Sequence, residues 1–412
     1  MRREAGWHER VARVVARTPV TDIHTHLYAR AFGPLLLWGI DELLTYHYLA
    51  AEVLRVSPIA YEEFWALDKR RQADLVWREL FLERSPISEA CRGVLTVLEQ
   101  LGLDVGLRDL DAYRDCFAHR CVTDHLDAVF ECARLRSVVM TNDPFDPLER
   151  PIWERGFDAD PRFHAALRID PLLNDWAASC TKLSGWGYDV EAALGVKTLA
   201  EIRRFLGEWV RRMKALYLAV SLPPTFDYPE DSPRAKILEA CVLPVAREHN
   251  LPFAMMVGVK RQVNPALKLA ADGVGLSNVE AVTRLCAHYP ENKFMVTMLA
   301  RENQHELCVA ARKFRNLFLF GCWWFLNTPS LIEEMTRMRF ELLGLGVAPQ
   351  HSDARVLDQV IYKWAHSRAI IARVLADKYA DLAATGWIVD EREIERDAAR
   401  LLGQNFWDFL GR

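Results

Sequence analysis

The sequence lacks several features that would place it in large classes of protein. No run of about 20 consecutive apolar residues occurs in its 412 residues, so we expect no membrane span. The net charge is only -4, which predicts neither a nucleic-acid-binding surface nor a membrane-binding one. The charged N-terminus has no apolar core of the kind found in signal peptides. We therefore expect a soluble, cytoplasmic protein.

Two kinds of motif are also missing. The nine cysteines include no C-x-x-C pair, and an odd, scattered set fits reduced and mostly buried thiols. No G-x-G-x-x-G pattern follows the first predicted strand, which argues against a dinucleotide-binding sheet. Because no low-complexity linker divides the chain, we expect residues 1–412 to form a single domain.

What recurs along the chain is a short apolar run that ends in polar residues and is followed by a helical pattern. Near-continuous hydrophobic runs are typical of strands that are buried on both faces. The eight runs are Val20–His26, Ser137–Asp143, His164–Asp170, Leu216–Ser221, Phe253–Val259, Phe294–Leu299, Leu317–Trp324 and Gly346–Asp353. The predicted helices are 198–214, 232–249, 278–289, 302–315 and 329–344. This alternation predicts an α/β fold, a (β/α)8 TIM barrel.

One spacing in this pattern is irregular. About 110 residues separate the first predicted strand from the second, far more than one crossover helix requires. The stretch 40–135 is rich in Leu, Trp, Glu and Arg at helical spacing. We therefore predict a helical insertion after the first strand, over the barrel mouth where active sites form.

The first strand ends in a pattern that suggests a metal site. Side chains two residues apart on a strand point to the same face, so His24 and His26 can aim at one point. Closure of a barrel would bring Asp353, at the end of the eighth strand, beside them. Two imidazoles and a carboxylate suit a catalytic divalent ion, zinc first and manganese next. The alternatives are that the histidine pair is only exposed at the end of a strand, without a function, and that Asp353 only caps the next helix.

Six short segments resemble the uronate isomerases, a branch of the amidohydrolase superfamily of metal-binding TIM barrels. They occur in the order found in that family, from about residue 20 to residue 370. The segments are His24-x-His26, Asp41 to Tyr48 (DELLTYHY), Thr141 to Glu149 (TNDPFDPLE), Leu167 to Pro171 (LRIDP), Trp323 to Asn327 (WWFLN) and Ser352 to Arg355 (SDAR). The family interconverts aldohexuronates and ketohexuronates, for example glucuronate and fructuronate.

The resemblance implies a role for individual residues. His24, His26 and Asp353 match the metal ligands, and Asp353 also matches a catalytic acid–base group. The other catalytic matches are His47 and Tyr48, a pair that reaches over the substrate, and Arg355, which follows the strand 8 aspartate. The substrate-binding matches are Arg168, which could hold a carboxylate through its two-pronged guanidinium, and Trp323 and Trp324, which could stack on a sugar.

Several of these residues also have a purely structural interpretation. Tyr48 could be an interface aromatic residue, and Arg168 could be an ion-pair partner of Asp170 or Asp143. At least one of the two tryptophans could belong to the core. The sequence leaves these alternatives open.

The chain departs from the family pattern at two strands. Met256 stands where the family has a strand 5 histidine, and Val220 to Pro224 (VSLPP) replaces a strand 4 S-D-H-G run. Neither methionine nor proline can carry a proton near neutral pH. His351, two residues before Asp353, could compensate by facing the same cavity and binding substrate; the alternative is a buried histidine bonded to the backbone.

We therefore expect a metal-dependent aldose–ketose isomerase that acts on a hexuronate and forms a homo-oligomer. The metal motif alone does not distinguish this enzyme from a hydrolase or lactonase that attacks with a metal-bound hydroxide. A barrel that binds a sugar acid without turnover is the third interpretation.

Overall fold

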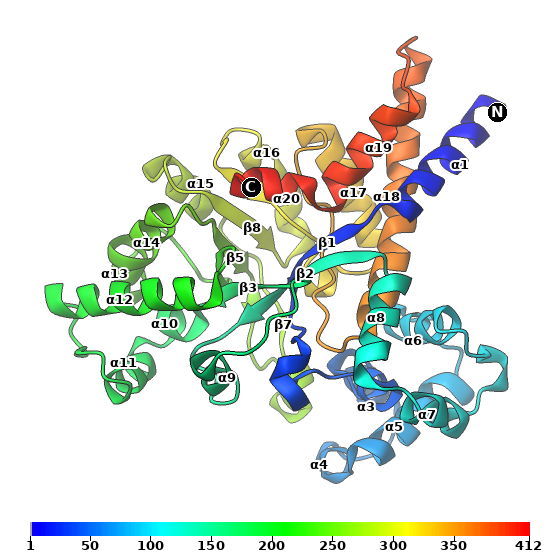
Figure 1. Ribbon diagram of the computed structural model, residues 1–412, viewed down its shortest axis with the longest axis horizontal. Coiled ribbons are helices and arrows are strands. Elements are labelled where there is room, and N and C mark those ends of the chain that lie inside the picture. Colours follow the sequence, from blue (N-terminus) through cyan, green and yellow to red (C-terminus); the bar gives the residue numbers. More distant parts are fainter. Residues whose placement is uncertain (1) are drawn as a thin grey trace.

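A parallel sheet of seven strands lies at the centre of the protein (Figure 1). The computed structural model describes residues 2–412, with side chains from residue 6 onward. The strand order is β1-β2-β3-β4-β5-β8-β9. The strands are β1 (Val20–Thr25), β2 (Leu135–Asn142), β3 (Phe163–Arg168), β4 (Leu218–Leu222), β5 (Phe253–Val257), β8 (Phe294–Met298) and β9 (Leu317–Leu319). The first six predicted strands are confirmed to within two residues at each end.

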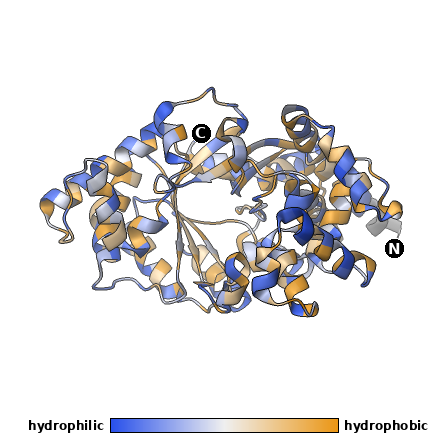
Figure 2. Cartoon of the chain, turned by 90° about the horizontal axis from the view of Figure 1, so that it is seen from below, coloured by the Kyte–Doolittle hydropathy of each residue, from blue (hydrophilic) through white to orange (hydrophobic). Residues whose placement is uncertain are grey.

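Amphipathic helices cover the outside of the curled sheet (Figure 2). Their buried residues and the outward-facing strand residues form two apolar clusters, one that includes α18 and one that includes α10 to α16. These helices are α9 (Arg150–Arg155), α10 (Asp170–Asn174), α11 (Trp176–Gly185), α12 (Val196–Met213), α13 (Pro233–Ile237), α14 (Leu243–Glu248), α15 (Val279–His288), α16 (Gln304–Ala311), α17 (Pro329–Leu343) and α18 (Gln359–Ala384). No helix in the described part of the chain is long and apolar enough to cross a bilayer.

The inward faces of the strands form a second core inside the curl of the sheet. Ile23, Ala219 and Met256 contribute to it from three strands. At one end, Phe406 of α20 (Asn405–Leu410) adds its fully buried ring. Burial on both faces explains why the strands read as unbroken apolar runs rather than as alternating ones.

Seven helices lie between β1 and β2 and group beside α18, at the lower right of Figure 1. Local capping fixes several starts: Ser88, for example, accepts a hydrogen bond from the Cys91 amide. These helices are α2 (Ile40–Leu44), α3 (His47–Val56), α4 (Tyr61–Ala66), α5 (Lys69–Trp77), α6 (Glu89–Gln100), α7 (Leu110–Ala118) and α8 (Val122–Cys132). Helices α1 (Arg2–Arg17) and α19 (Glu391–Ala399) lie near the other end of α18.

A buried contact ties these helices to the start of α18. Asp358 accepts hydrogen bonds from His125 of α8, at 2.6 Å, and from the Gly39 amide before α2, at 2.8 Å. Both side chains are fully buried. The segment that carries Arg355 is therefore fixed from the side of the helices as well as from the sheet.

The expected eighth strand, Gly346–Asp353, is not a strand in the structure. It makes one isolated parallel bridge, between Ala348 and Phe320. Beyond that bridge the segment turns: the Asp353 amide donates to the His24 carbonyl, and Asp353 has a left-handed φ of 54°. A regular strand cannot hold a left-handed residue, so hydrogen bonding to β1 replaces strand geometry here.

The seventh and fifth predicted strands are also shorter than expected. β9 ends at Leu319, and Gly321 follows with a left-handed φ of 67°. The fifth run ends at Val257; Gly258 then turns the chain into a small antiparallel hairpin that the sequence analysis missed, β6 (Val259–Lys260) with β7 (Gly273–Val274). Positive φ at glycine is what ends each strand.

Gly321→Ala should destabilise the fold strongly. A Cβ at residue 321 would lie 1.7 Å from Nδ1 of the buried His351 ring, in addition to the strain of a positive φ. Gly187→Ala is the matched control, because Gly187 also has a positive φ, 85°, but has open space around it. We expect a cost of about 1 kcal/mol from the backbone strain in both variants, and about 1–3 kcal/mol more in Gly321→Ala from the clash. Equal thermal-unfolding midpoints for the two variants would contradict this.

Candidate metal centre and active site

The structure brings His24, His26 and Asp353 together at the end of β1. Their candidate ligand atoms all lie within 4.8 Å of one another. Asp353 Oδ1 is 3.4 Å from His26 Nε2 and 3.7 Å from His24 Nε2. Ligand atoms about 2.0–2.1 Å from a tetrahedral ion are roughly 3.3 Å apart, so these spacings leave room for one ion between the three side chains.

The far side of each imidazole is held by a hydroxyl group. Tyr217 donates to the Ile23 carbonyl, so its oxygen can accept from His24 Nδ1 at 3.2 Å. Thr141 likewise donates to a backbone carbonyl and can accept from His26 Nδ1 at 2.9 Å. This network places the proton of each ring on Nδ1 and leaves the Nε2 lone pair free, as metal ligation requires.

Burial keeps both histidines neutral. It lowers the pKa of His24 to about 3 and that of His26 well below its usual value. His24 Nε2 and Asp353 Oδ1 are buried and have no hydrogen-bond partner among the described residues. Such orphaned polar atoms are costly, and a divalent cation would satisfy both of them. The donor set therefore fits a metal ion.

Asp22 holds the segment that carries Asp353 in place. The fully buried Asp22 carboxylate accepts from the Ser352 amide at 3.0 Å and from the Trp364 indole at 2.8 Å. The His26 amide donates to the Ala354 carbonyl at 2.8 Å. These contacts fix Asp353 beside β1 without a regular eighth strand.

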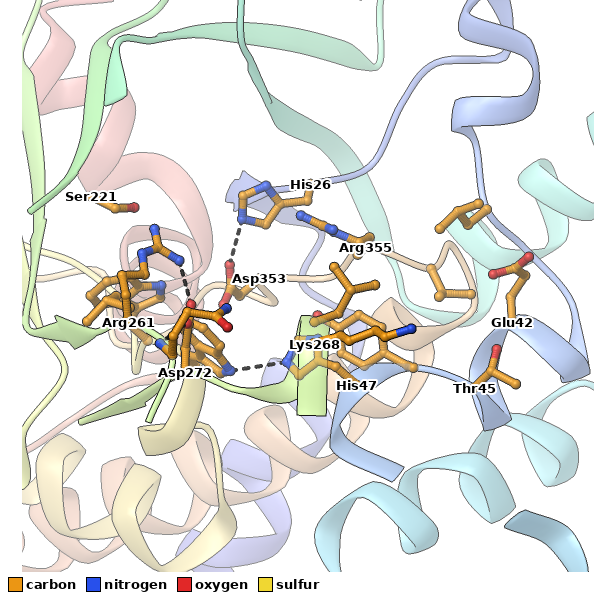
Figure 3. A pocket seen from close by; sticks show the side chains of 18 of the residues that line it. His26, Glu42, Thr45, His47, Ser221, Arg261, Lys268, Asp272, Asp353 and Arg355 are labelled. Atoms are coloured by element: carbon orange, nitrogen blue, oxygen red, sulfur yellow. Dashed lines mark hydrogen bonds and ion pairs between the residues drawn. The ribbon is translucent and has the colours of Figure 1, made fainter. Parts of the chain in front are cut away.

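A cavity of about 470 Å³ opens from the metal centre (Figure 3). His26, Asp353 and Arg355 line it and lie near one another. One wall comes from α2 to α5, with Thr45, Tyr46, His47 and Trp65 among its residues, and the opposite wall from the hairpin around Arg261 and Lys268. The two walls touch, since the Trp65 indole donates to the Ala266 carbonyl at 2.9 Å.

His47 and the two tryptophans line the cavity, but with different exposures. The Trp324 indole donates to His47 Nε2 at 3.2 Å, which joins the loop after β9 to α3. Burial lowers the pKa of His47 to about 3, so this histidine is neutral. Trp323 lines the cavity but is only 3% exposed and belongs to the inner core. The core interpretation therefore holds for Trp323, while Trp324 is partly exposed.

The two arginines at the cavity differ in their partners. Arg168 makes a two-pronged ion pair with Asp170, with contacts of 2.8 and 2.9 Å, so the structural alternative is observed, although the residue also lines the cavity. The Arg355 guanidinium has no hydrogen bond or ion pair with any described side chain. Arg355 is therefore a cation at the metal centre that remains available to an anionic ligand.

His351 and Tyr48 differ from the sequence-based expectation, whereas Met256 lies where it was expected. His351 does not share a face with Asp353: its ring is fully buried, 5.1 Å from the His24 ring, with neither nitrogen hydrogen-bonded to a described residue. The left-handed turn at Asp353 breaks the alternation on which that prediction rested. Tyr48 packs against Lys363, while its neighbour Tyr46 lines the cavity. Met256 does line the cavity, so the missing histidine leaves an apolar surface there.

Lys363 is a residue that the sequence analysis missed. It lies on the buried face of α18, is 4% exposed, and makes no hydrogen bond or ion pair within the described residues. Its ammonium is 5.3 Å from the ring centroids of both Tyr48 and Tyr362. The only sequence signal was a lysine within the apolar face of a long helix.

Tyr217→Phe should weaken metal binding by about 10- to 100-fold, because His24 Nδ1 then loses its hydrogen-bond acceptor. Zinc affinity measured by competition with a chelator tests this. Tyr113→Phe is the matched control: its hydroxyl also donates to a backbone carbonyl, that of Asp104, but within the helices between β1 and β2. An unchanged affinity in Tyr217→Phe, or an equal loss in both variants, would refute the role of Tyr217.

Lys363→Met should raise the thermal stability near neutral pH. Burial lowers the pKa of Lys363 to about 8 from 10.5, although nearby carboxylates, Asp353 first, oppose the shift. Below pH 8 the folded state therefore carries a penalty on the order of 3 kcal/mol. Between pH 8 and 10.5 the unfolded chain binds more protons, so the penalty fades as pH rises. The difference in unfolding midpoint between variant and wild type should thus be large at pH 7 and small at pH 10.

The matched control is Lys378→Met on the same helix. Lys378 makes a surface ion pair with Glu341 at 2.8 Å, and such pairs contribute little. A lower midpoint for Lys363→Met than for wild type at pH 7 would show that the ammonium is stabilising instead.

Comparison with known proteins gave matches among solved structures. No family model and no curated protein matches the chain. A uronate isomerase from Bacillus halodurans C-125 is 56% identical, with a TM-score of 0.98, and the match covers 99% of this chain and 97% of that one.

Two more distant structures share the fold. A uronate isomerase from Thermotoga maritima is 15% identical with a TM-score of 0.77, and covers 98% of this chain and 97% of its own. A glucuronate isomerase from Caulobacter crescentus is 14% identical with a TM-score of 0.80, and covers 99% and 94%. The identity of 56% over almost the whole of both chains confirms the family that the motifs indicated: the protein belongs to the uronate isomerases and is an isomerase.

Proposed function

We propose that the enzyme interconverts an aldohexuronate, such as glucuronate, and the corresponding ketohexuronate. The observation that carries this proposal is the position of Arg355, an unpaired cation, beside the His24–His26–Asp353 cluster in a cavity of about 470 Å³. A hexuronate brings one carboxylate and several hydroxyl oxygens, which match a cation and a metal centre.

We also propose that the segment 346–353, although not a regular strand, takes the place of the eighth strand and closes the barrel between β9 and β1. Its support is the Ala348–Phe320 bridge on one side and the Asp353–His24 backbone hydrogen bond on the other. In this architecture residues 1–412 form one domain, and residues 40–135 form a helical subdomain over the barrel mouth. Thr45, Tyr46 and His47 would then be its contribution to the active site.

Zinc is the metal we propose, with manganese as the second choice. His24, His26 and Asp353 would hold it, and their Nε2–Oδ1 separations of 3.4 and 3.7 Å are close to a tetrahedral arrangement. When bound, such an ion would polarise a substrate oxygen or activate a water molecule.

Aldose–ketose isomerisation moves one proton between carbon atoms and one between oxygen atoms. We assign the carbon-bound proton to Asp353, a carboxylate that lines the cavity where the substrate would bind. It would remove the proton from C2, leaving the electron pair in a C1–C2 double bond, and then return the proton to C1.

Tyr48 is the group we propose for the oxygen-bound proton. It does not itself line the cavity, but its ring lies beside that of His47, which does, with 4.4 Å between the ring centroids, and we propose that it reaches the substrate from behind this wall. Burial raises its pKa well above 10, so it is protonated at neutral pH and can donate to O1, regaining a proton from O2. Arg355 would assist by holding the substrate's charge nearby. His47, fixed by the Trp324 indole, would orient the substrate from the same wall.

The remaining predicted substrate contacts are proposed as follows. Arg168 uses two of its N–H groups on Asp170 and could offer others to the substrate carboxylate. Trp324 would cover one face of the sugar acid, with Trp323 packed behind it. His351 is assigned no substrate contact because it is buried beside His24 rather than in the cavity lining.

The test is proton exchange in D2O. Metal-loaded protein should exchange the C2 proton of glucuronate or galacturonate and form the ketose, as followed by NMR. His24→Ala should lose both activities, because one ligand of the metal is missing, and should bind less zinc by elemental analysis.

His164→Ala is the matched control, since His164 is on β3 and packs against Trp407, away from the cavity. It should keep both metal and activity. Turnover of a lactone panel without exchange would instead show a hydrolase, and metal-independent binding without turnover would show a sugar-acid-binding barrel.

A further inference from the structure

Tyr46 occupies a defined position in the cavity wall. It is the N-cap residue of α3, separated from α2 by Thr45 alone, and has an extended backbone at φ -63° and ψ 146°. It lines the same cavity as His26, Asp353 and Arg355. No role for it follows from the motifs discussed above.

Neighbouring rings hold Tyr46 in one orientation. Its ring centroid is 4.1 Å from that of His47, and it meets the Tyr48 ring edge-on at 5.0 Å. His47 is in turn fixed by the Trp324 indole. A ring packed on two sides loses little further freedom when it binds a ligand, which favours recognition.

The hydroxyl of Tyr46 is unlike other hydroxyls at this site. Those of Tyr217 and Thr141 donate to backbone carbonyls, and that of Tyr28 donates to Glu149. The Tyr46 hydroxyl has no hydrogen bond to any described residue, and the side chain is half-buried. Because Tyr46 lines the cavity and no described protein group competes for its hydroxyl, a ligand in the cavity can become its hydrogen-bond partner.

The electrostatic surroundings keep this hydroxyl a donor. Burial raises the pKa of Tyr46, the Asp353 carboxylate adds to the effect, and the Arg355 guanidinium opposes it. The hydroxyl is therefore protonated at neutral pH. It also lies within electrostatic reach of both groups, which places it near the proposed reacting end of a bound sugar acid.

We propose that Tyr46 is a specificity-determining residue whose hydroxyl hydrogen-bonds a hydroxyl group of the bound hexuronate. This inference rests on the proposed function and extends it to the choice between epimers. A donor in a fixed position forms a good hydrogen bond to a sugar hydroxyl in one configuration and is left unpaired by the other configuration. The two epimers should therefore differ in binding free energy. Tyr46 acts in binding, whereas Tyr48 carries the proton.

The experiment compares Tyr46→Phe with wild type, and with Tyr61→Phe as control. Tyr61 lies on α4 among the same helices, is 36% exposed and does not line the cavity. Two readouts are needed. The first is kcat/KM for glucuronate and for galacturonate, which differ at C4. The second is calorimetric binding of glucarate and galactarate, diacids that lack the aldehyde and cannot isomerise.

Tyr46→Phe should lose roughly tenfold in kcat/KM and in affinity for the preferred epimer, and less than twofold for the other, because only the hydroxyl is removed. Zinc content and unfolding midpoint should match those of Tyr61→Phe. Equal losses for both epimers, or none, would overturn the proposal.

The experiment distinguishes a failure of the proposed function from a failure of the role proposed for Tyr46. If no variant and no wild-type preparation isomerises a uronate, the proposed function fails. Epimer-selective loss of diacid binding in Tyr46→Phe would then still support the role of Tyr46.

Discussion

The active site depends on one buried carboxylate, that of Asp22. Burial raises its pKa to about 6, so the anion is costly to hold, and the Ser352 amide and Trp364 indole offset that cost. The same bonds attach the segment before Asp353 and the start of α18 to β1. Regular strand pairing contributes little to holding this segment, since within the described residues it makes a single bridge to the sheet, at Ala348.

Burial serves a second purpose at the metal centre. The same desolvation that penalises the Asp22 carboxylate keeps His24 and His26 neutral. Their Nδ1–H groups donate hydrogen bonds to the hydroxyl oxygens of Tyr217 and Thr141. Both rings then present a free nitrogen to one point. The inner core of the sheet is thus a means of setting protonation as well as a source of stability.

The two structural parts contribute different chemistry. β1 and the turn at Asp353 supply the metal ligands, which need fixed positions, while the helices between β1 and β2 supply Tyr46, His47 and Tyr48. The Trp324–His47 hydrogen bond joins the two parts at the cavity.

The sequence by itself determined the elements that depend on local pattern. Six strands and the H-x-H pair could be predicted because apolar periodicity and i, i+2 geometry are properties of adjacent residues. Only the tertiary structure decided that the eighth segment turns at Asp353, that His351 is buried, and that Tyr46 rather than Tyr48 lines the cavity. These outcomes follow from hydrogen bonds and packing between residues hundreds of positions apart, which no local pattern records.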